Sequence, residues 1–216
     1  MDTQIYFVIF EDDPFTQHPF MNFLAHIFLS GDDPQIKIGN FMADGIRGQD
    51  YLAYPEGIKK GILLHRAIDT FTDEHPVFRR STKRLHTEFH HYSGVIVDVF
   101  YDHFLAKNWK IYHAENLKTY AQSFYNLLEE NYDILTPKVQ HLLPIMIKYD
   151  WLASYASVDG ISAILSQMDS RTQYKSGMTM AGAALLRHYD EFETDFTEFF
   201  TDLQIICRQK LNEPST

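Results

Sequence analysis

One segment constrains this chain more than any other: the run VIVDVFYDHFL, from Val95 to Leu105. Wound as a helix, it is apolar on every side except at Asp98, Asp102 and His103, and such a helix is normally buried. Asp98 and Asp102 are four residues apart, so the helix stacks them on one side. Burying an unpaired charge is costly, so these carboxylates need basic partners, a metal ion or protonation. The fold must gather other helices around a charged centre.

Helix signals also punctuate the rest of the chain. Pro76 separates a helix ending near Asp73 from another over about residues 77–91, and Ser93 and Asp159 stand where helix caps are expected. Proline marks three further helix starts: Asp33-Pro34, Pro55 and Thr136-Pro137. Strand-like alternation is confined to Ile5–Phe10. We therefore predict an all-α fold, a single helical domain of about seven to eight helices.

The N-terminal twenty residues differ from the rest. They hold four acidic residues and two prolines but no Lys or Arg. We therefore predict an N-terminal extension outside the fold over residues 1–20, a helical hydrolase domain over 21–211 and a C-terminal tail over 212–216.

Composition excludes several classes of protein. The chain has 216 residues and a net charge of −10, which argues against a nucleic-acid partner. Its single cysteine, Cys207, excludes a disulfide framework and a thiolate zinc site. The apolar runs are too short for a membrane span, and the N-terminus lacks the basic region of a secretory signal. We expect a cytoplasmic protein; the oligomeric state stays open.

A second helix carries ligand-type residues on an apolar face. Over Gly61–Asp73, His65 and Asp69 are four residues apart and share their face with Ile58 and Ile62. Three other segments likewise set His or Asp among apolar neighbours: residues 22–26, 39–44 and 98–103. Oxygen and imidazole donors without thiolates suit Mn²⁺, Fe²⁺, Mg²⁺ or Zn²⁺. Such a metal polarises a phosphoryl oxygen and lowers the pKa of a bound water, so the pattern favours metal-assisted phosphoester hydrolysis.

These segments together resemble the acyl carrier protein phosphodiesterase family. The matching motifs are MNFLAH (21–26), GNFMADGIRG (39–48), HRAIDTFTD (65–73) and DVFYDHFL (98–105). The resemblance covers about residues 21–210 and implies hydrolysis of the phosphodiester that joins 4′-phosphopantetheine to a serine of holo-acyl carrier protein. It also implies Mn²⁺ dependence and a divergent, HD-phosphohydrolase-like fold.

The resemblance further implies which side chains form the site. The expected metal ligands are His26, Asp44, His65 and Asp69, with Asp102 as a fifth candidate. Asp98 is expected to orient one of the ligands without binding the metal itself. The sequence departs from the HD signature, because it has no contiguous His-Asp pair and only Asp102-His103 in the reverse order.

Two further residues are candidates for the chemistry. Arg66 is positioned to contact the phosphate, with pairing to a neighbouring Asp as the alternative. His103 is a candidate proton donor to the leaving serine oxygen, with a structural core histidine as the alternative.

A basic stripe is expected on the helix that follows Pro76. Arg79, Arg80, Lys83 and Arg84 fall within six residues and on the side opposite Phe78. An acyl carrier protein is small and acidic, so we interpret the stripe as its docking surface, with an ordinary solvated face as the alternative.

Two rival functions remain open. One is an HD-like phosphohydrolase acting on a nucleotide or another small molecule, which gives the basic stripe no role. The other is a non-catalytic helical module in which the Asp and His residues form internal ion pairs and the stripe binds a partner.

Overall fold

The computed structural model describes residues 23–213, and in that range its regular structure is entirely helical, which confirms the all-α prediction. The α-helices are α1 (Phe23–Leu29), α2 (Pro34–Met42), α3 (Glu56–Glu74), α4 (Pro76–Phe89), α5 (Ser93–Lys107), α6 (Trp109–Tyr112), α7 (Leu117–Glu130), α8 (Pro137–Tyr149), α9 (Trp151–Ser154), α10 (Val158–Arg171), α11 (Ala181–Arg187) and α12 (Tyr189–Asn212). Short 3₁₀ helices are η1 (Ala43–Gly45), η2 (Asp50–Ala53), η3 (His90–Tyr92), η4 (Tyr132–Ile134) and η5 (Met178–Met180).

The described range contains twelve α-helices, more than the predicted seven to eight, and eight of them have nine residues or more. α2, α4 and α8 each begin at a proline that the sequence marked. The two predicted caps were wrong. Ser93 lies inside α5 and donates its hydroxyl to the carbonyl of His90 at 2.7 Å. α10 starts before Asp159, because the side chain of Ser157 accepts the backbone N–H of Gly160 and caps the helix there.

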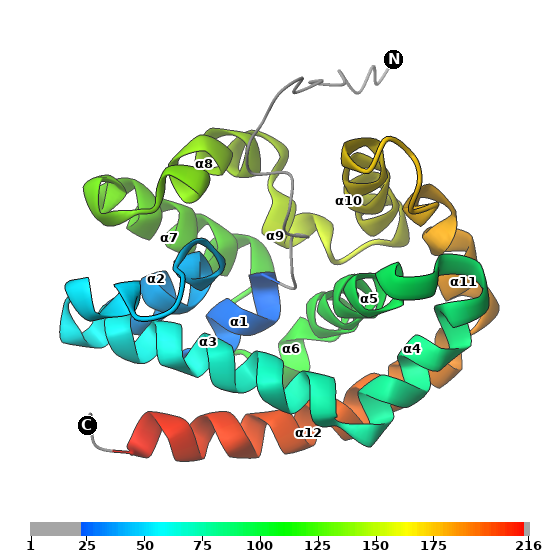
Figure 1. Ribbon diagram of the computed structural model, residues 1–216, viewed down its shortest axis with the longest axis horizontal. Helices are drawn as coiled ribbons and strands as arrows, with labels where there is room; N and C mark the ends of the chain where they lie inside the picture. The colour runs from blue at the N-terminus through cyan, green and yellow to red at the C-terminus, as the bar shows by residue number, and fades with distance from the viewer. Residues whose placement is uncertain (1–22, 214–216) are drawn as a thin grey trace.

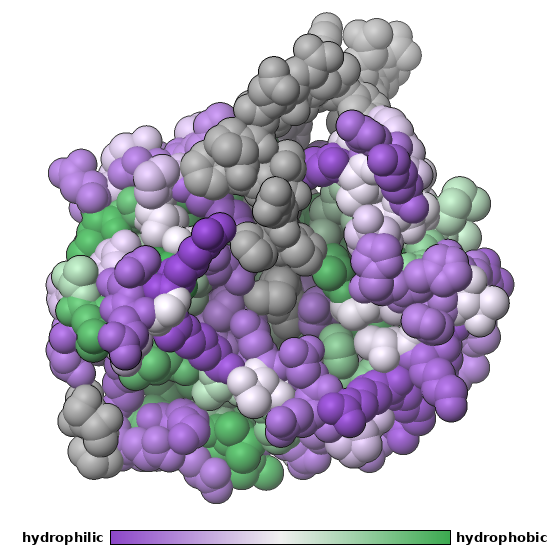
Figure 2. Space-filling view, in the orientation of Figure 1, coloured by the Kyte–Doolittle hydropathy of each residue, from purple (hydrophilic) through white to green (hydrophobic). Residues whose placement is uncertain are grey.

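Helix α5 forms the centre of the molecule, as the apolar run predicts. Every residue from Ile96 to Ala106 is buried, and the helix packs against α1, α4, α10 and α12 (Figure 1). Figure 1 also shows α3 and α4 following one another along one side, with α12 beside them. The face of the molecule seen in this orientation is mainly hydrophilic, and its hydrophobic residues form small separate areas (Figure 2).

Helices α2 and α3 touch backbone to backbone through two glycines. A Cβ added at Gly39 would lie 2.2 Å from the carbonyl oxygen of Ile58, and one at Gly61 would lie 2.3 Å from that of Ile36. Any larger residue would push the helices apart. This close approach brings the end of α2 beside the middle of α3, where the candidate site lies.

The C-terminal helix is fastened to the same region. Lys60 of α3 donates to the carbonyl oxygens of Leu211 and Glu213 at 2.7 and 3.2 Å. The predicted extension, residues 1–20, lies outside the described residues, as do residues 214–216 of the predicted tail. No helix between residues 23 and 213 is long and apolar enough to cross a membrane.

Candidate metal centre

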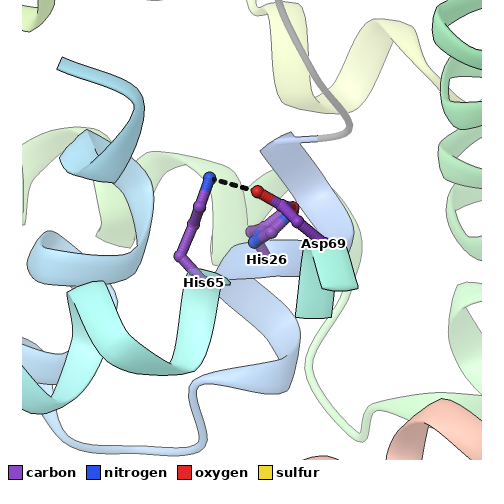
Figure 3. A group of neighbouring side chains, drawn as sticks. All are labelled: His26, His65 and Asp69. Atoms are coloured by element: carbon purple, nitrogen blue, oxygen red, sulfur yellow. Dashed lines mark ion pairs between the residues drawn. The ribbon is translucent and has the colours of Figure 1, made fainter. Parts of the chain in front are cut away.

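Three predicted ligands converge between α1 and α3. One nitrogen each from His26 and His65 and one oxygen from Asp69 all lie within 4.8 Å of one another. The Asp69 carboxylate is 3.5 Å from Nε2 of His26 and 3.2 Å from Nε2 of His65 (Figure 3). Both histidines are buried, while Asp69 is partly exposed. The group therefore brings two nitrogens and a carboxylate oxygen toward one point.

The local sequence explains this convergence. His65 and Asp69 are one turn apart on α3, and the face they share is anchored by the buried Ile62 and Ile68. His26 comes from α1, a seven-residue helix that is almost entirely buried. Because α1 packs against α2, and α2 against α3, the three side chains meet although they are far apart in the chain.

Asp44 joins the group from the turn after α2. It lies in η1, and its Oδ1 is 3.3 Å from Nε2 of His65. Burial would raise the pKa of Asp44, but its hydrogen bond and attraction to His65 outweigh this and lower it. Asp44 thus contributes negative charge at the edge of the cluster through its contact with His65.

The surroundings keep Asp44 and Asp69 ionised and, without a metal, keep His65 protonated. Burial would lower the pKa of His65, but hydrogen bonds to Asp44 and Asp69 raise it to about 9. Burial would raise the pKa of Asp69, but hydrogen bonds with His26 and His65 hold it well below the usual range. The proton of His65 that faces the two carboxylates occupies a position that a divalent cation also favours.

One residue of the site was not predicted: Asn40. Its side chain is fully buried and lies 2.7 Å from Nδ1 of His26, and its backbone carbonyl lies 2.8 Å from Nδ1 of His65. The available signal was its place in the GNFMAD segment, where an uncharged amide sits among apolar residues. Asp44 is the one charged residue of that segment, and it was therefore the one predicted to belong to the site.

Asp102 does not join the three converging side chains. One of its oxygens accepts the backbone N–H of Leu24 at 2.9 Å and the other that of Ala25 at 2.8 Å. It therefore caps the N-terminus of α1, where carboxylates are favoured. Burial raises its pKa to about 7, with the two N–H groups acting in the opposite direction. We correct its predicted role from metal ligand to the residue that fixes α1, and with it His26.

Asp98 lies on the same side of α5 as Asp102, and its predicted role in supporting the metal site stays a prediction. It is 9% exposed, and among the described residues nothing donates a hydrogen bond to it or forms an ion pair with it. Burial raises its pKa well above the ordinary value, and the negative charge of Asp69 adds to the effect. A nearby cation would relieve this electrostatic cost.

His103 is placed away from the cluster. Its Nδ1 lies 2.8 Å from the carbonyl of Tyr155, and its Nε2 lies 2.8 Å from the hydroxyl of Tyr189. Both nitrogens are thus used to join α5 to the end of α9 and the start of α12. Burial lowers its pKa. The predicted proton donor is corrected to the alternative, a structural core histidine.

Within residues 23–213, Arg66 forms no ion pair with an aspartate, so the alternative role predicted for it is not observed. Its guanidinium donates to the carbonyl of Ile46 at 3.3 Å and lies 5.1 Å from the ring centroid of Tyr51. It is therefore held against the segment that follows Asp44. A contact with phosphate stays a prediction.

The predicted basic stripe is partly neutralised. Arg80 pairs with Asp195 at 2.5 Å and with Glu198 at 2.8 Å, and Arg84 also pairs with Asp195. Asp195 is buried and additionally accepts from the hydroxyl of Ser81 at 2.7 Å. We correct Arg80 and Arg84 to structural partners that join α4 to α12. Arg79, which donates to the carbonyl of Asp73 at 2.8 Å, and Lys83 remain exposed.

The remaining cluster fits a divalent metal. Imidazole nitrogens and carboxylate oxygens suit Mn²⁺, Fe²⁺ and Zn²⁺, and the ligand atoms of His26, His65 and Asp69 are close enough to share one ion. The buried carboxylate of Asp98, which has no hydrogen-bond or ion-pair partner among residues 23–213, is the further charge that such an ion would compensate.

Comparison with known proteins gives a consistent result. The family described as acyl carrier protein phosphodiesterase matches residues 21–203. The protein named acyl carrier protein phosphodiesterase in Pectobacterium atrosepticum is 30% identical over 189 residues, covering 87% of this chain and 98% of the relative. Those of Serratia proteamaculans and Yersinia pestis are each 28% identical over 191 residues, covering 88% of this chain and 99% of the relative. No solved structure matches the chain, so the HD-like fold stays a prediction.

Proposed function

This chain belongs to the acyl carrier protein phosphodiesterase family, and from that premise we propose that it is a phosphoric diester hydrolase of the cytoplasm that acts on holo-acyl carrier protein. Water adds to phosphorus, the bond to the serine oxygen breaks, and the serine oxygen leaves with a proton. The products are apo-acyl carrier protein and free 4′-phosphopantetheine.

The observation that supports this proposal is the convergence of His26, His65 and Asp69. We propose that they hold Mn²⁺ through the two Nε2 atoms and a carboxylate oxygen, with Asp44 and Asp98 as further oxygen donors. When bound, such an ion supplies positive charge that polarises a phosphoryl oxygen and lowers the pKa of a water molecule.

The protein's own residues supply the rest of the site. Asp102 holds the N-terminus of α1 and so fixes the position of His26. Arg66, one residue after His65, is the cation proposed to bind a phosphate oxygen of the substrate. Because its guanidinium is already held by the carbonyl of Ile46 and the ring of Tyr51, little side-chain freedom is lost on binding.

The experiment combines metal analysis with turnover. The purified protein is assayed for bound Mn²⁺, then incubated with holo-acyl carrier protein, and the carrier is examined by mass spectrometry for loss of the prosthetic group. Asp69→Ala should lose metal and turnover, whereas Asp190→Ala, at an exposed position on α12, should keep both. A protein that binds no divalent metal and leaves the prosthetic group intact refutes the proposal.

A second candidate substrate is a small phosphodiester, including a nucleotide. It is favoured by one observation: Arg80 and Arg84 are already paired within the molecule, which reduces the charge available for an acidic protein. Competition separates the two candidates. If apo-acyl carrier protein fails to inhibit hydrolysis of a small diester at any concentration tested, a carrier-protein substrate is excluded.

A further inference from the structure

We propose that Asn40 is a positioning residue that fixes the ring orientation and tautomer of both metal-binding histidines. This inference rests on the proposed function, since it assigns a role toward the proposed metal. It follows from the way one buried side chain and its own backbone meet Nδ1 of His26 and Nδ1 of His65.

The direction of each hydrogen bond can be worked out from its partners. The Nδ2 group of Asn40 lies 3.0 Å from the carbonyl oxygen of His26 and 2.9 Å from Oγ of Ser30. A carbonyl oxygen only accepts, so this group is the donating NH₂ and the other atom, Oδ1, is an acceptor. Nδ1 of His26, 2.7 Å from Oδ1, must then carry the proton.

The same reasoning applies to His65 through the backbone. Its Nδ1 lies 2.8 Å from the carbonyl oxygen of Asn40 and 3.2 Å from Oδ1, and both are acceptors. Nδ1 of His65 is therefore protonated as well. In each neutral ring the proton on Nδ1 leaves Nε2 as the unprotonated nitrogen, and both Nε2 atoms face Asp69.

The amide is held rigidly enough to impose this geometry. Asn40 is fully buried, and its segment of α2 is pressed against α3 by Gly39 and Gly61. Ser30, which accepts from Asn40, in turn donates to the carbonyl of His26 at 2.8 Å. The site is thus oriented before any metal arrives.

The two histidines depend on Asn40 in different ways, and this difference gives the test. Among residues 23–213, Nδ1 of His26 is held by the side chain of Asn40, whereas Nδ1 of His65 is held mainly by the backbone carbonyl of Asn40, which every substitution keeps. In Asn40→Ala, His26 should lose its fixed tautomer while His65 retains it. A residue that merely filled space would not produce this asymmetry.

The measurement is the ¹⁵N and ¹H correlation spectrum of the histidine rings, recorded on the Zn²⁺-loaded protein and, without metal, at pH 10. Mn²⁺ affinity is measured in parallel by electron paramagnetic resonance. We expect a mixed tautomer for His26 in Asn40→Ala and a loss of about 10- to 100-fold in Mn²⁺ affinity. Asn40→Asp keeps an acceptor for Nδ1 of His26 and should recover part of that affinity.

Ser30→Ala is the matched control. It removes two buried hydrogen bonds of the same network without touching either Nδ1, so both tautomers and the Mn²⁺ affinity should stay close to the parent values. The inference is overturned if Asn40→Ala leaves the His26 ring signals unchanged, or if Ser30→Ala weakens Mn²⁺ binding as much as Asn40→Ala. A parent protein with ordered Nδ1–H tautomers at pH 10 but no affinity for any divalent metal would refute the proposed function and leave the orienting role of Asn40 intact.

Discussion

His26 and His65 lie nearly face to face, with ring centroids 4.2 Å apart and planes inclined by 31°. Both turn Nε2 toward the carboxylate of Asp69. Without a metal, the raised pKa of His65 means that a proton lies between its ring and the carboxylates of Asp44 and Asp69. A divalent cation bound at the same point competes with that proton, which links metal affinity to pH and to the charge of Asp69.

Asp69→Asn should abolish high-affinity metal binding. The substitution keeps the size of the side chain but removes the charge that both histidines face. We expect Mn²⁺ affinity and turnover of holo-acyl carrier protein to fall by at least about 100-fold. This is more than the loss expected when a residue that only orients a ligand is removed. Isothermal titration calorimetry measures the affinity, and Asp190→Asn is the control. Parent-like affinity in Asp69→Asn would exclude Asp69 as a ligand.

The metal-free protein should lose stability as the solution becomes alkaline. The pKa of His65 is raised to about 9 from an ordinary 6.5, so the folded chain binds this proton more tightly than the unfolded chain. The resulting stabilisation is complete below pH 6.5 and disappears as the pH rises through 9. It amounts to at most about 3 kcal/mol.

Thermal unfolding between pH 6 and pH 9.5 checks this dependence. The melting temperature of the metal-free parent should fall across that range, and that of His65→Gln should fall less. Saturating Mn²⁺ should flatten the parent's profile, because the metal displaces the proton. A parent whose stability rises with pH over this window would contradict the assigned charge of His65.

The helical fold and most of the converging side chains could be predicted from sequence, since both depend on spacing within single helices. His65 and Asp69 are one turn apart on α3, and the apolar run around Asp98 indicates a central buried helix. The role of Asp102 could not be predicted, because its partners are backbone N–H groups 77 and 78 residues away. Contacts between distant segments leave no periodic signal in either segment.

The basic stripe on α4 is a second case in which a contact with a distant segment could not be predicted from the sequence. A helical projection of α4 correctly places its cations on one face, but it cannot show that α12 brings Asp195 against Arg80 and Arg84. Asn40 was missed for a different reason: an uncharged amide gives no sign in the sequence that both its ends are used.

Asp195→Ala should be strongly destabilising. The carboxylate is buried and satisfies Arg80, Arg84 and the hydroxyl of Ser81, so its removal leaves several groups unpaired. We expect a loss of about 3 to 5 kcal/mol in the free energy of unfolding, measured with urea. Glu198→Ala removes only an exposed contact of Arg80 and should cost less than about 1 kcal/mol. Equal effects of the two substitutions would contradict the structural role of Asp195.

Lys83→Glu tests docking of an acidic carrier without disturbing that network. Lys83 is exposed on α4, so its reversal should leave folding intact. If α4 guides the carrier, KM for holo-acyl carrier protein should rise roughly two- to fivefold at low salt, the equivalent of a surface ion pair. The difference from the parent should shrink as salt is added. Lys118→Glu, on the exposed face of α7, is the control, and equal KM values for all three proteins would remove α4 from the docking surface.

Gly61→Ala should damage the site through the packing of α2 on α3. The added methyl group would lie 2.3 Å from the carbonyl oxygen of Ile36 and 2.7 Å from the backbone nitrogen of Asn40, so α2 must move away. Because Asn40 and His65 meet across this contact, we expect a loss of about 2 kcal/mol or more in stability together with weaker Mn²⁺ binding. Gly94→Ala is the matched control, since a Cβ at Gly94 would meet nothing within 4 Å. It should leave Mn²⁺ binding unchanged and stabilise α5 by up to about 1 kcal/mol. Gly61→Ala with parent-like stability and metal affinity would show that the close approach of the two helices is not required for the site.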